Sequence, residues 1–144
     1  MIVESKLKLF LVDDDAIFSK LMEIELLQHP EFEVECYASG ELCMANISNN
    51  PDIIILDYNL DGMDKNAMNG IETLNRIKAH DRDIQVVMLS SQDDIDVAIN
   101  SVQHSAIDYV IKSETAFLRI RKIITTILSI KKMEKGLSWY VAKV

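Results

Sequence analysis

The residues of this sequence that could do chemistry follow short apolar runs. Three aspartates, Asp13 to Asp15, come directly after the first run, Asp57 ends the third, Ser90 ends the fourth and Lys112 follows the fifth. Carboxylates that converge on one point repel each other unless a cation neutralises them, and such oxygen ligands suit Mg²⁺, with Mn²⁺ as the alternative ion. Asp57 is then the candidate nucleophile toward phosphorus, with Ser90 as a hydroxyl donor and Lys112 as a fixed positive charge.

Each of these residues has a simpler explanation when it is taken alone. An aspartate after a strand is often the N-cap of the next helix, which fits Asp15 better than a ligand role does. Ser90 could be a helix cap and Lys112 an ordinary surface residue. Their joint occurrence at four strand ends favours one shared site.

The elements that must position these residues alternate along the chain. Five short runs are rich in β-branched residues and mostly continuously apolar, which is typical of strands buried on both faces. Segments with helical spacing separate them, so the pattern predicts a parallel sheet covered by helices on both sides, with the functional groups beyond the carboxyl ends of the strands. The predicted strands are Leu7 to Val12, Phe32 to Tyr37, Ile53 to Leu56, Val86 to Leu89 and Asp108 to Ile111.

Apolar residues at helical spacing predict which helix faces point inward. The predicted inward sets are Ile17, Leu21 and Ile24; Leu42 and Ala45 with Met44 in a weaker helix from Ser39 to Ser48; Ile71, Leu74 and Ile77; and Ile95, Ile99 and Val102.

The predicted last helix, Phe117 to Ile130, is so rich in isoleucine and leucine that more than one stripe is apolar. Two interpretations stay open: the extra surface meets a partner or a second copy in a homodimer, or the tail from Lys131 folds back over it. We expect one folded domain over residues 1–133 and a tail over 134–144, which is too short for a separate output domain.

The net charge, the cysteine content and the lack of long apolar stretches argue against several classes of function. A net charge of -8 argues against a nucleic-acid surface, although residues 116–144 carry 7 Lys and Arg against 1 acidic residue, which we interpret as a solvated helix face. Cys36 and Cys43 match neither a zinc site nor a disulfide framework, so we expect free thiols. The sequence shows neither a signal peptide nor an apolar stretch of the ~20 residues that span a bilayer, which predicts no membrane contact and a cytoplasmic location.

Four segments in order resemble the response-regulator receiver domain of two-component signalling, the CheY-like family, over about residues 6–130. The resemblance implies a flavodoxin-like, doubly wound (βα)₅ α/β fold with a five-stranded parallel sheet in the order 2-1-3-4-5. The segments are Leu9-Phe10-Leu11-Val12-Asp13-Asp14-Asp15, Ile53-Ile54-Ile55-Leu56-Asp57, Val87-Met88-Leu89-Ser90-Ser91 and Ala106-Ile107-Asp108-Tyr109-Val110-Ile111-Lys112.

The resemblance also assigns roles to single residues. It implies that Asp57 is phosphorylated and that Asp13, Asp14, Asp57 and the backbone carbonyl of Asn59 hold the metal. Lys112 would bind the phosphoryl group, and Ser90 and Tyr109 would form a switch pair. The amides Asn59 and Gln92 would tune the lifetime of the phosphoryl group.

Two features depart from the family pattern. The usual Lys-Pro step is Lys112-Ser113 here, so either its peptide is trans and Lys112 sits differently, or a cis form is held under strain. Asp61-Gly62-Met63-Asp64 and Ala67-Met68-Asn69-Gly70 both resemble the single turn that opens the third helix. One of them is predicted to be an insertion that acts as a partial lid or a partner-recognition loop.

The first functional interpretation is a signalling switch, not an enzyme, that accepts a phosphoryl group from a histidine kinase or histidine phosphotransfer protein and then binds a downstream protein. The alternatives are the N-terminal receiver part of a longer regulator and a pseudo-receiver scaffold that is not phosphorylated. A magnesium-dependent phosphatase is disfavoured because Asn59 stands where such enzymes commonly carry a second carboxylate.

Overall fold

Strands and helices alternate along the whole chain in the computed structural model, which describes residues 6–60, 66–91 and 95–143. All five predicted strands are present, each within one residue of its predicted bounds. The elements are β1 (Leu7–Val12), α1 (Ala16–Leu27), β2 (Phe32–Tyr37), α2 (Gly40–Ala45), a short 3₁₀ helix η1 (Ile47–Asn49), β3 (Ile53–Asp57), α3 (Gly70–His80), β4 (Gln85–Ser90), α4 (Ile95–Gln103), β5 (Asp108–Ile111) and α5 (Ala116–Lys143).

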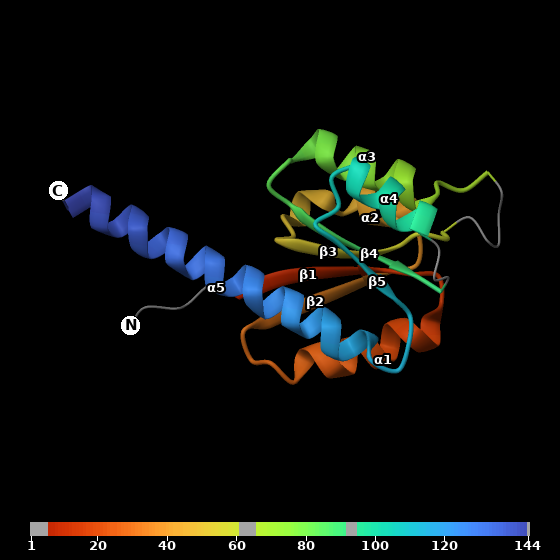
Figure 1. Cartoon of the computed structure of the whole chain (residues 1–144), viewed down its shortest axis with the longest axis horizontal. Coiled ribbons are helices and arrows are strands. Elements are labelled where there is room, and N and C mark those ends of the chain that lie inside the picture. The colour runs from red at the N-terminus through yellow and green to blue at the C-terminus, as the bar shows by residue number, and fades with distance from the viewer. Residues whose placement is uncertain (1–5, 61–65, 92–94, 144) are drawn as a thin grey trace.

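The strands form one parallel sheet in the order β2-β1-β3-β4-β5, which confirms the predicted flavodoxin-like topology. Helices α1 and α5 cover one face, and α2, α3 and α4 cover the other (Figure 1). The register pairs Val12 with Leu56, Asp57 with Leu89 and Ser90 with Ile111, so the carboxyl ends of four strands meet at one edge.

The continuous apolar runs are explained by this two-sided burial. In β1, Leu9 and Leu11 belong to the core beneath α1 and α5, whereas Phe10 and Val12 belong to the core beneath α2 and α3. Because successive side chains of a strand point to opposite faces, nearly every position of such a strand is apolar, with Lys8 near the start of β1 as the exception. β3 follows the same rule and is buried along its length.

The predicted inward face of α1 is wrong. Ile17 is 76% exposed, and Leu21 and Ile24 are each 50% exposed. Met22 and Leu26 point into the core instead. The helix carries two apolar stripes nearly half a turn apart, and periodicity alone does not say which of them faces the sheet.

Two further helix faces are corrected for the same reason. In α2, Leu42 and Ala45 are exposed, Met44 is half-buried, and Cys43 points inward. In α4, Ile99 and Val102 are exposed, while Val97 and Ser101 are buried. The side chain of Ile95 lies outside the described residues. The prediction for α3 is confirmed at Leu74 and Ile77, which are fully buried, with Ile71 packed at the margin.

Helix α5 is longer than predicted. It runs without interruption from Ala116 to Lys143, and its second half projects beyond the sheet (Figure 1). The tail from Lys131 therefore does not fold back over the helix, and that interpretation is wrong. Within the described ranges no helix is both long and apolar enough to cross a bilayer.

Candidate functional site

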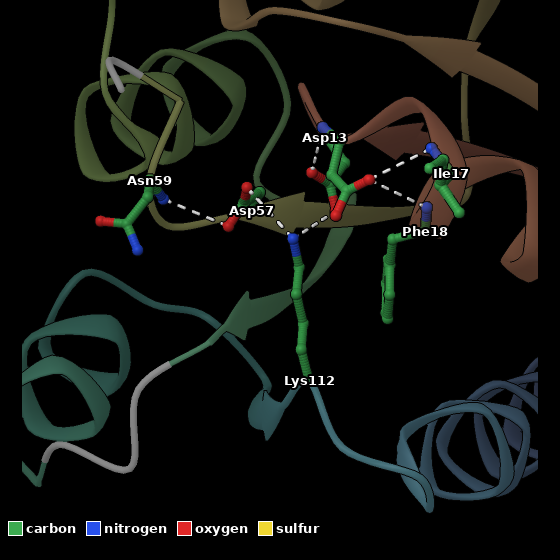
Figure 2. A network of polar contacts seen from close by, with 7 residues as sticks. Asp13, Ile17, Phe18, Asp57, Asn59 and Lys112 are labelled. Atoms are coloured by element: carbon green, nitrogen blue, oxygen red, sulfur yellow. Dashed lines mark hydrogen bonds and ion pairs between the residues drawn. The ribbon is translucent and has the colours of Figure 1, made fainter. Parts of the chain in front are cut away.

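Three predicted site residues, from the ends of three different strands, meet at the carboxyl edge of the sheet. Lys112 Nζ lies 2.7 Å from Asp13 Oδ2 and 3.4 Å from Asp57 Oδ2 (Figure 2). Asp13 and Asp57 are 5% and 3% exposed, so this ion-pair cluster is almost completely removed from water. Asp14, the next residue along the chain, stays exposed at its rim.

The loop after β1 orients the first two aspartates. The Asp13 backbone N–H donates to Tyr37 O at 3.0 Å, and Asp13 Oδ1 accepts from the Asp15 N–H at 2.9 Å. Asp15 Oδ1 accepts from the N–H groups of Ile17 and Phe18, both at 3.1 Å, and so caps α1. The prediction that Asp15 is a helix cap is confirmed, and this leaves Asp13 and Asp14 for the site.

The loop after β3 returns so that the backbone of Gly70 lies close to the backbone at the end of β3. Gly70, the first residue of α3, lies so near the β3 end that an added Cβ would come within 2.5 Å of Asp57 O and 2.6 Å of Tyr58 Cα. The Gly70 N–H donates to Tyr58 O at 3.1 Å, and Asn69 caps α3 by accepting from the Glu72 N–H. Ala67 to Gly70 is therefore the turn that opens α3, while Asp61 to Asp64 lies outside the described residues.

Lys112 reaches the site although no proline follows it. No cis peptide bond occurs in the described ranges, so the Lys112–Ser113 peptide is trans. The Lys112 N–H donates to Ser90 O at 2.7 Å, which continues the pairing of β4 with β5 past the strand ends. The alternative of a cis form held under strain is therefore wrong, and with a trans peptide the Lys112 side chain still contacts Asp13 and Asp57.

Sequence reasoning missed a second contact of Lys112. Its Nζ lies 4.8 Å from the centre of the Phe18 ring, and Phe18 stacks on Phe117 with ring centroids 5.5 Å apart. An ammonium group over an aromatic face is attracted by the ring quadrupole. Seven other residues of α1 are also hydrophobic, so the sequence pattern does not single out Phe18. Only its position one turn after the aspartates could have indicated it.

The buried carboxylates strongly affect one another. Burial, followed by the nearby charge of Asp13, raises the pKa of Asp57 to about 7, although Lys112 and the Asn59 N–H oppose that rise. The pKa of Asp14 is also raised, first by burial and then by Asp13. Burial alone would lower the pKa of Lys112, but its contacts with Asp13 and Asp57 outweigh burial and raise it. The cluster thus holds more negative charge than one lysine neutralises.

The carboxylates fit a divalent cation. One oxygen from each of Asp13, Asp14 and Asp57 lies within 4.8 Å of the other two. Asp13 Oδ2 is completely buried, and its contact with Lys112 is an ion pair without hydrogen-bond geometry; no other donor among the described residues satisfies it. Carboxylate oxygens with unused acceptor capacity are what Mg²⁺ and Mn²⁺ bind.

The remaining predicted residues lie around this cluster. Ser90 is fully buried at the end of β4, and Tyr109 is half-buried on the neighbouring strand β5, where it packs at the margin of the core beneath α2 and α3. The Asn59 N–H donates to Asp57 Oδ1 at 3.2 Å, while its side-chain amide points away from Asp57 (Figure 2). Gln92 lies outside the described residues.

Comparisons with known proteins agree with this geometry. A family model described as the response regulator receiver domain matches residues 9–134. The chemotaxis protein CheY of Listeria monocytogenes is 31% identical over 108 residues, which cover 74% of this chain and 86% of that protein. A CheY-like receiver domain protein from Methanospirillum hungatei has the same fold, with a TM-score of 0.75, 21% identity, and coverage of 90% of this chain and 99% of the other.

Other relatives are much longer than this chain. The C4-dicarboxylate transport transcriptional regulatory protein DctD of Rhizobium meliloti is 31% identical over 104 residues, which cover 72% of this chain but 21% of that protein. Across five such relatives the chain spans 21% to 52% of their length.

Proposed function

Because this chain belongs to the response regulator receiver domain family of two-component signalling, we propose that it is a switch that accepts a phosphoryl group on Asp57. The observation that carries this proposal is the shared contact of Lys112 with Asp13 and Asp57 at the carboxyl edge of the sheet. A buried carboxylate beside a lysine and two further carboxylates suits phosphoryl transfer better than a structural role, because burial of like charges is costly.

The proposed reaction transfers phosphorus from a histidine to an aspartate. An Asp57 carboxylate oxygen forms the new bond to phosphorus, the P–N bond to the donor imidazole breaks, and the electron pair and a proton end on that imidazole. Asp13, Asp14, Asp57 and the Asn59 carbonyl would hold Mg²⁺, or Mn²⁺, which when bound supplies positive charge to the phosphoryl oxygens. This chain thereby acts as a phosphoacceptor and not as an enzyme that turns over external substrates, apart from slow loss of its own phosphoryl group.

Lys112 supplies the fixed charge on the other side of the phosphoryl group. Its Nζ already contacts Asp57 Oδ2, so a phosphoryl group built on Asp57 forms within its reach. The Phe18 ring and the Ser90 carbonyl hold the two ends of the Lys112 residue in place. Preorganised positive charge of this kind stabilises the transition state without further rearrangement.

Ser90 and Tyr109 are the proposed switch pair. Ser90 ends β4 at the site, and Tyr109 lies on the adjacent strand β5, three residues before Lys112. New contacts between the phosphoryl oxygens and Ser90 favour one of two packings of this region, which is a population shift. The exposed residues Ile99, Val102 and Ile107 on the α4–β5 side are then available to a downstream protein.

The proposed phosphoryl donor is a histidine kinase or a histidine phosphotransfer protein. Any donor must cover the carboxyl edge of the sheet, where the first turn of α1 begins. Exposed apolar residues continue from that turn along one side of α1, at Ile17, Leu21 and Ile24. An apolar stripe that starts beside the acceptor is suited to a protein donor, whereas a small-molecule donor would not need it.

Asn59 and Gln92 are proposed to tune the lifetime of the acyl phosphate. Both side chains are amides that could bind an attacking water. The Asn59 amide points away from Asp57, so it is not needed to form the bond. We expect Asn59→Ala and Gln92→Ala to change the decay rate and to leave formation intact. Unchanged decay in both variants would remove this part of the proposal.

Two alternatives remain within the same family. The lengths of the relatives favour reading the sequence as the receiver part of a longer regulator with an output domain. The pseudo-receiver scaffold is disfavoured because Asp13, Asp57 and Lys112 are all in contact. We place the domain in the cytoplasm, where its proposed kinase partner would meet it.

Phosphoryl uptake is tested by mass spectrometry after incubation with Mg²⁺ and acetyl phosphate. We expect one added phosphoryl group that is stable in acid, labile in base, dependent on Mg²⁺ and lost in Asp57→Ala. Asp15→Asn is the matched control, because asparagine caps a helix as well as aspartate does and should leave the adduct unchanged. No adduct on the wild type would favour the scaffold.

A further inference from the structure

The two carboxylates that Lys112 contacts fix the position of its ammonium group incompletely. The ion pair with Asp13 lacks hydrogen-bond geometry, and the hydrogen bond to Asp57 is long, at 3.4 Å. Backbone pairing of the Lys112 N–H with Ser90 O holds only the start of a long, flexible side chain. Ser113 stands where the family pattern has proline, so the turn after Lys112 lacks the fixed φ of that residue. The position of the ammonium group therefore depends on a further contact.

The aromatic ring of Phe18 provides this contact. The Lys112 Nζ lies over the ring, 4.8 Å from its centre, which is within the distance at which a cation is attracted to the negative face of an aromatic ring. The Lys112 side chain is 14% exposed, so little water competes for the ammonium group, and such an attraction is stronger without water. The ring does not change its charge during phosphoryl transfer, whereas Asp57 does. It can therefore hold the ammonium group before and after the reaction.

The local structure around Phe18 places its ring beside the site. Asp15 Oδ1 accepts from the Phe18 N–H at 3.1 Å, so the helix cap that follows the aspartates also fixes the Phe18 backbone. The Phe18 ring stacks on Phe117, in the first turn of α5, with an angle of 20° between the ring planes. Both rings pack against the core beneath α1 and α5. This packing restricts the Phe18 ring, which can thus act as a fixed support.

We propose that Phe18 is a positioning residue for phosphoryl transfer, because its ring face holds the Lys112 ammonium group within reach of Asp57. This inference rests on the proposed function and adds to the site a residue from α1 that none of the family segments contains. The competing explanation is that Phe18 only packs α1 against α5. In that case the electron density of its ring has no influence on the reaction.

Fluorination of the Phe18 ring separates the two explanations. Incorporation of the monofluoro, difluoro and trifluoro analogues of phenylalanine at position 18 withdraws electrons from the ring face and changes its shape little. We expect the rate of phosphoryl uptake from acetyl phosphate to fall with each added fluorine, and by about fivefold or more with three of them. The far-ultraviolet circular dichroism of each variant should remain that of the wild type.

The same series at Phe117 is the matched control. Fluorine there alters the stack with Phe18 but not the ring face that holds the ammonium group, so the uptake rate should be unchanged. Equal rates across the Phe18 series, in a wild type that does take up a phosphoryl group, overturn this inference and leave the proposed function intact. Equal slowing in both series also overturns it, because the substitutions then act through packing. A wild type without any uptake overturns the proposed function as well.

Nuclear magnetic resonance of protein with isotope-labelled lysine tests the contact without phosphoryl chemistry. Protons that lie over an aromatic face resonate upfield, so the ε-methylene protons of Lys112 should be upfield of those of an exposed lysine such as Lys20. The Lys112 signal is identified by its loss in Lys112→Met. Its upfield shift should disappear in Phe18→Leu and persist in Phe117→Leu. A Lys112 signal at the position of the exposed lysines in the wild type overturns the inference.

Discussion

Lys112 Nζ lies 2.7 Å from Asp13 Oδ2, so one ammonium group connects the loop after β5 to the loop after β1. The same atom contacts Asp57, the last residue of β3. All three groups are close to fully buried, with side-chain exposures of 14% for Lys112, 3% for Asp13 and 4% for Asp57. Removing the lysine leaves two carboxylates buried together, and the folding of this edge thus depends on the residues of the site.

We predict that Lys112→Met weakens both the fold and the chemistry. Without the ammonium group the metal-free protein should lose about 3 kcal/mol of unfolding free energy at neutral pH, because Asp13 and Asp57 lose their shared partner. Phosphoryl uptake from acetyl phosphate should slow about 100-fold, since a fixed charge on the phosphoryl oxygens is gone. Urea unfolding and the rate of adduct formation measure the two effects.

Lys20→Met is the control for this variant. Lys20 pairs with Glu23 at 3.0 Å, but on the exposed surface of α1, so its loss should alter neither quantity. If Lys112→Met took up phosphate at the wild-type rate, the assignment of Lys112 to the phosphoryl group would be wrong.

The raised pKa of Asp57 predicts how stability depends on pH in the metal-free protein. The folded state keeps the Asp57 proton up to about pH 7, whereas the unfolded chain loses it near the ordinary aspartate pKa of 3.8. The folded state therefore binds more protons between these values, and the free energy of unfolding falls as pH rises through this window. We expect a decrease on the order of 2 kcal/mol in EDTA.

Asp57→Asn should remove most of that pH dependence. Asparagine cannot ionise, so the variant should be more stable than the wild type above pH 7 and similar to it near pH 4. Saturating Mg²⁺ should restore wild-type stability at pH 7 to 8 and have little effect on the variant. Thermal unfolding at several pH values, with and without Mg²⁺, checks this; a flat wild-type profile in EDTA would contradict the raised pKa.

The close packing of Gly70 against the end of β3 couples the position of α3 to the geometry at Asp57. A Cβ on Gly70 would collide with the backbone of Asp57 and Tyr58, which has no flexible end to move away. We expect Gly70→Ala to cost about 3 kcal/mol and to slow adduct formation, because α3 must shift away from the phosphorylated residue. Gly136→Ala is the matched control, since nothing lies within 4 Å of its Cβ position and alanine favours helix. Equal stability of the two variants would show that α3 adjusts freely.

The sheet could be predicted because its strands are buried on both sides. In a chain where helical segments alternate with strands, a continuous apolar run such as Ile53 to Leu56 indicates a strand that is buried on both faces. The order of the strands followed from the family resemblance. The residues at the strand ends could be predicted for the same reason: parallel strands bring Asp13, Asp57 and Lys112 to one edge.

The helix faces could not be predicted in the same way. In α1 both the stripe through Ile17 and the stripe through Met22 are apolar at helical spacing, and only the packed structure shows that Met22 is the buried one. The contact of Phe18 with Lys112 joins residues 94 positions apart and depends on how α1 packs against the sheet and α5. Such contacts follow from packing, for which a local sequence pattern carries no signal.

The apolar side chains of Ile17, Leu21 and Ile24 form an exposed stripe on α1. If the stripe that begins at Ile17 receives a protein donor, Ile17→Gln/Leu21→Gln should slow phosphoryl transfer from a purified, autophosphorylated histidine kinase about tenfold or more. Uptake from acetyl phosphate should be unchanged, because the small donor needs only the cluster at Asp57. Leu27→Gln is the control: it is equally apolar and 52% exposed, but it lies at the far end of α1. Equal slowing with both donors would mean that the substitutions act through the site, and no slowing with the kinase would remove the stripe as its docking surface.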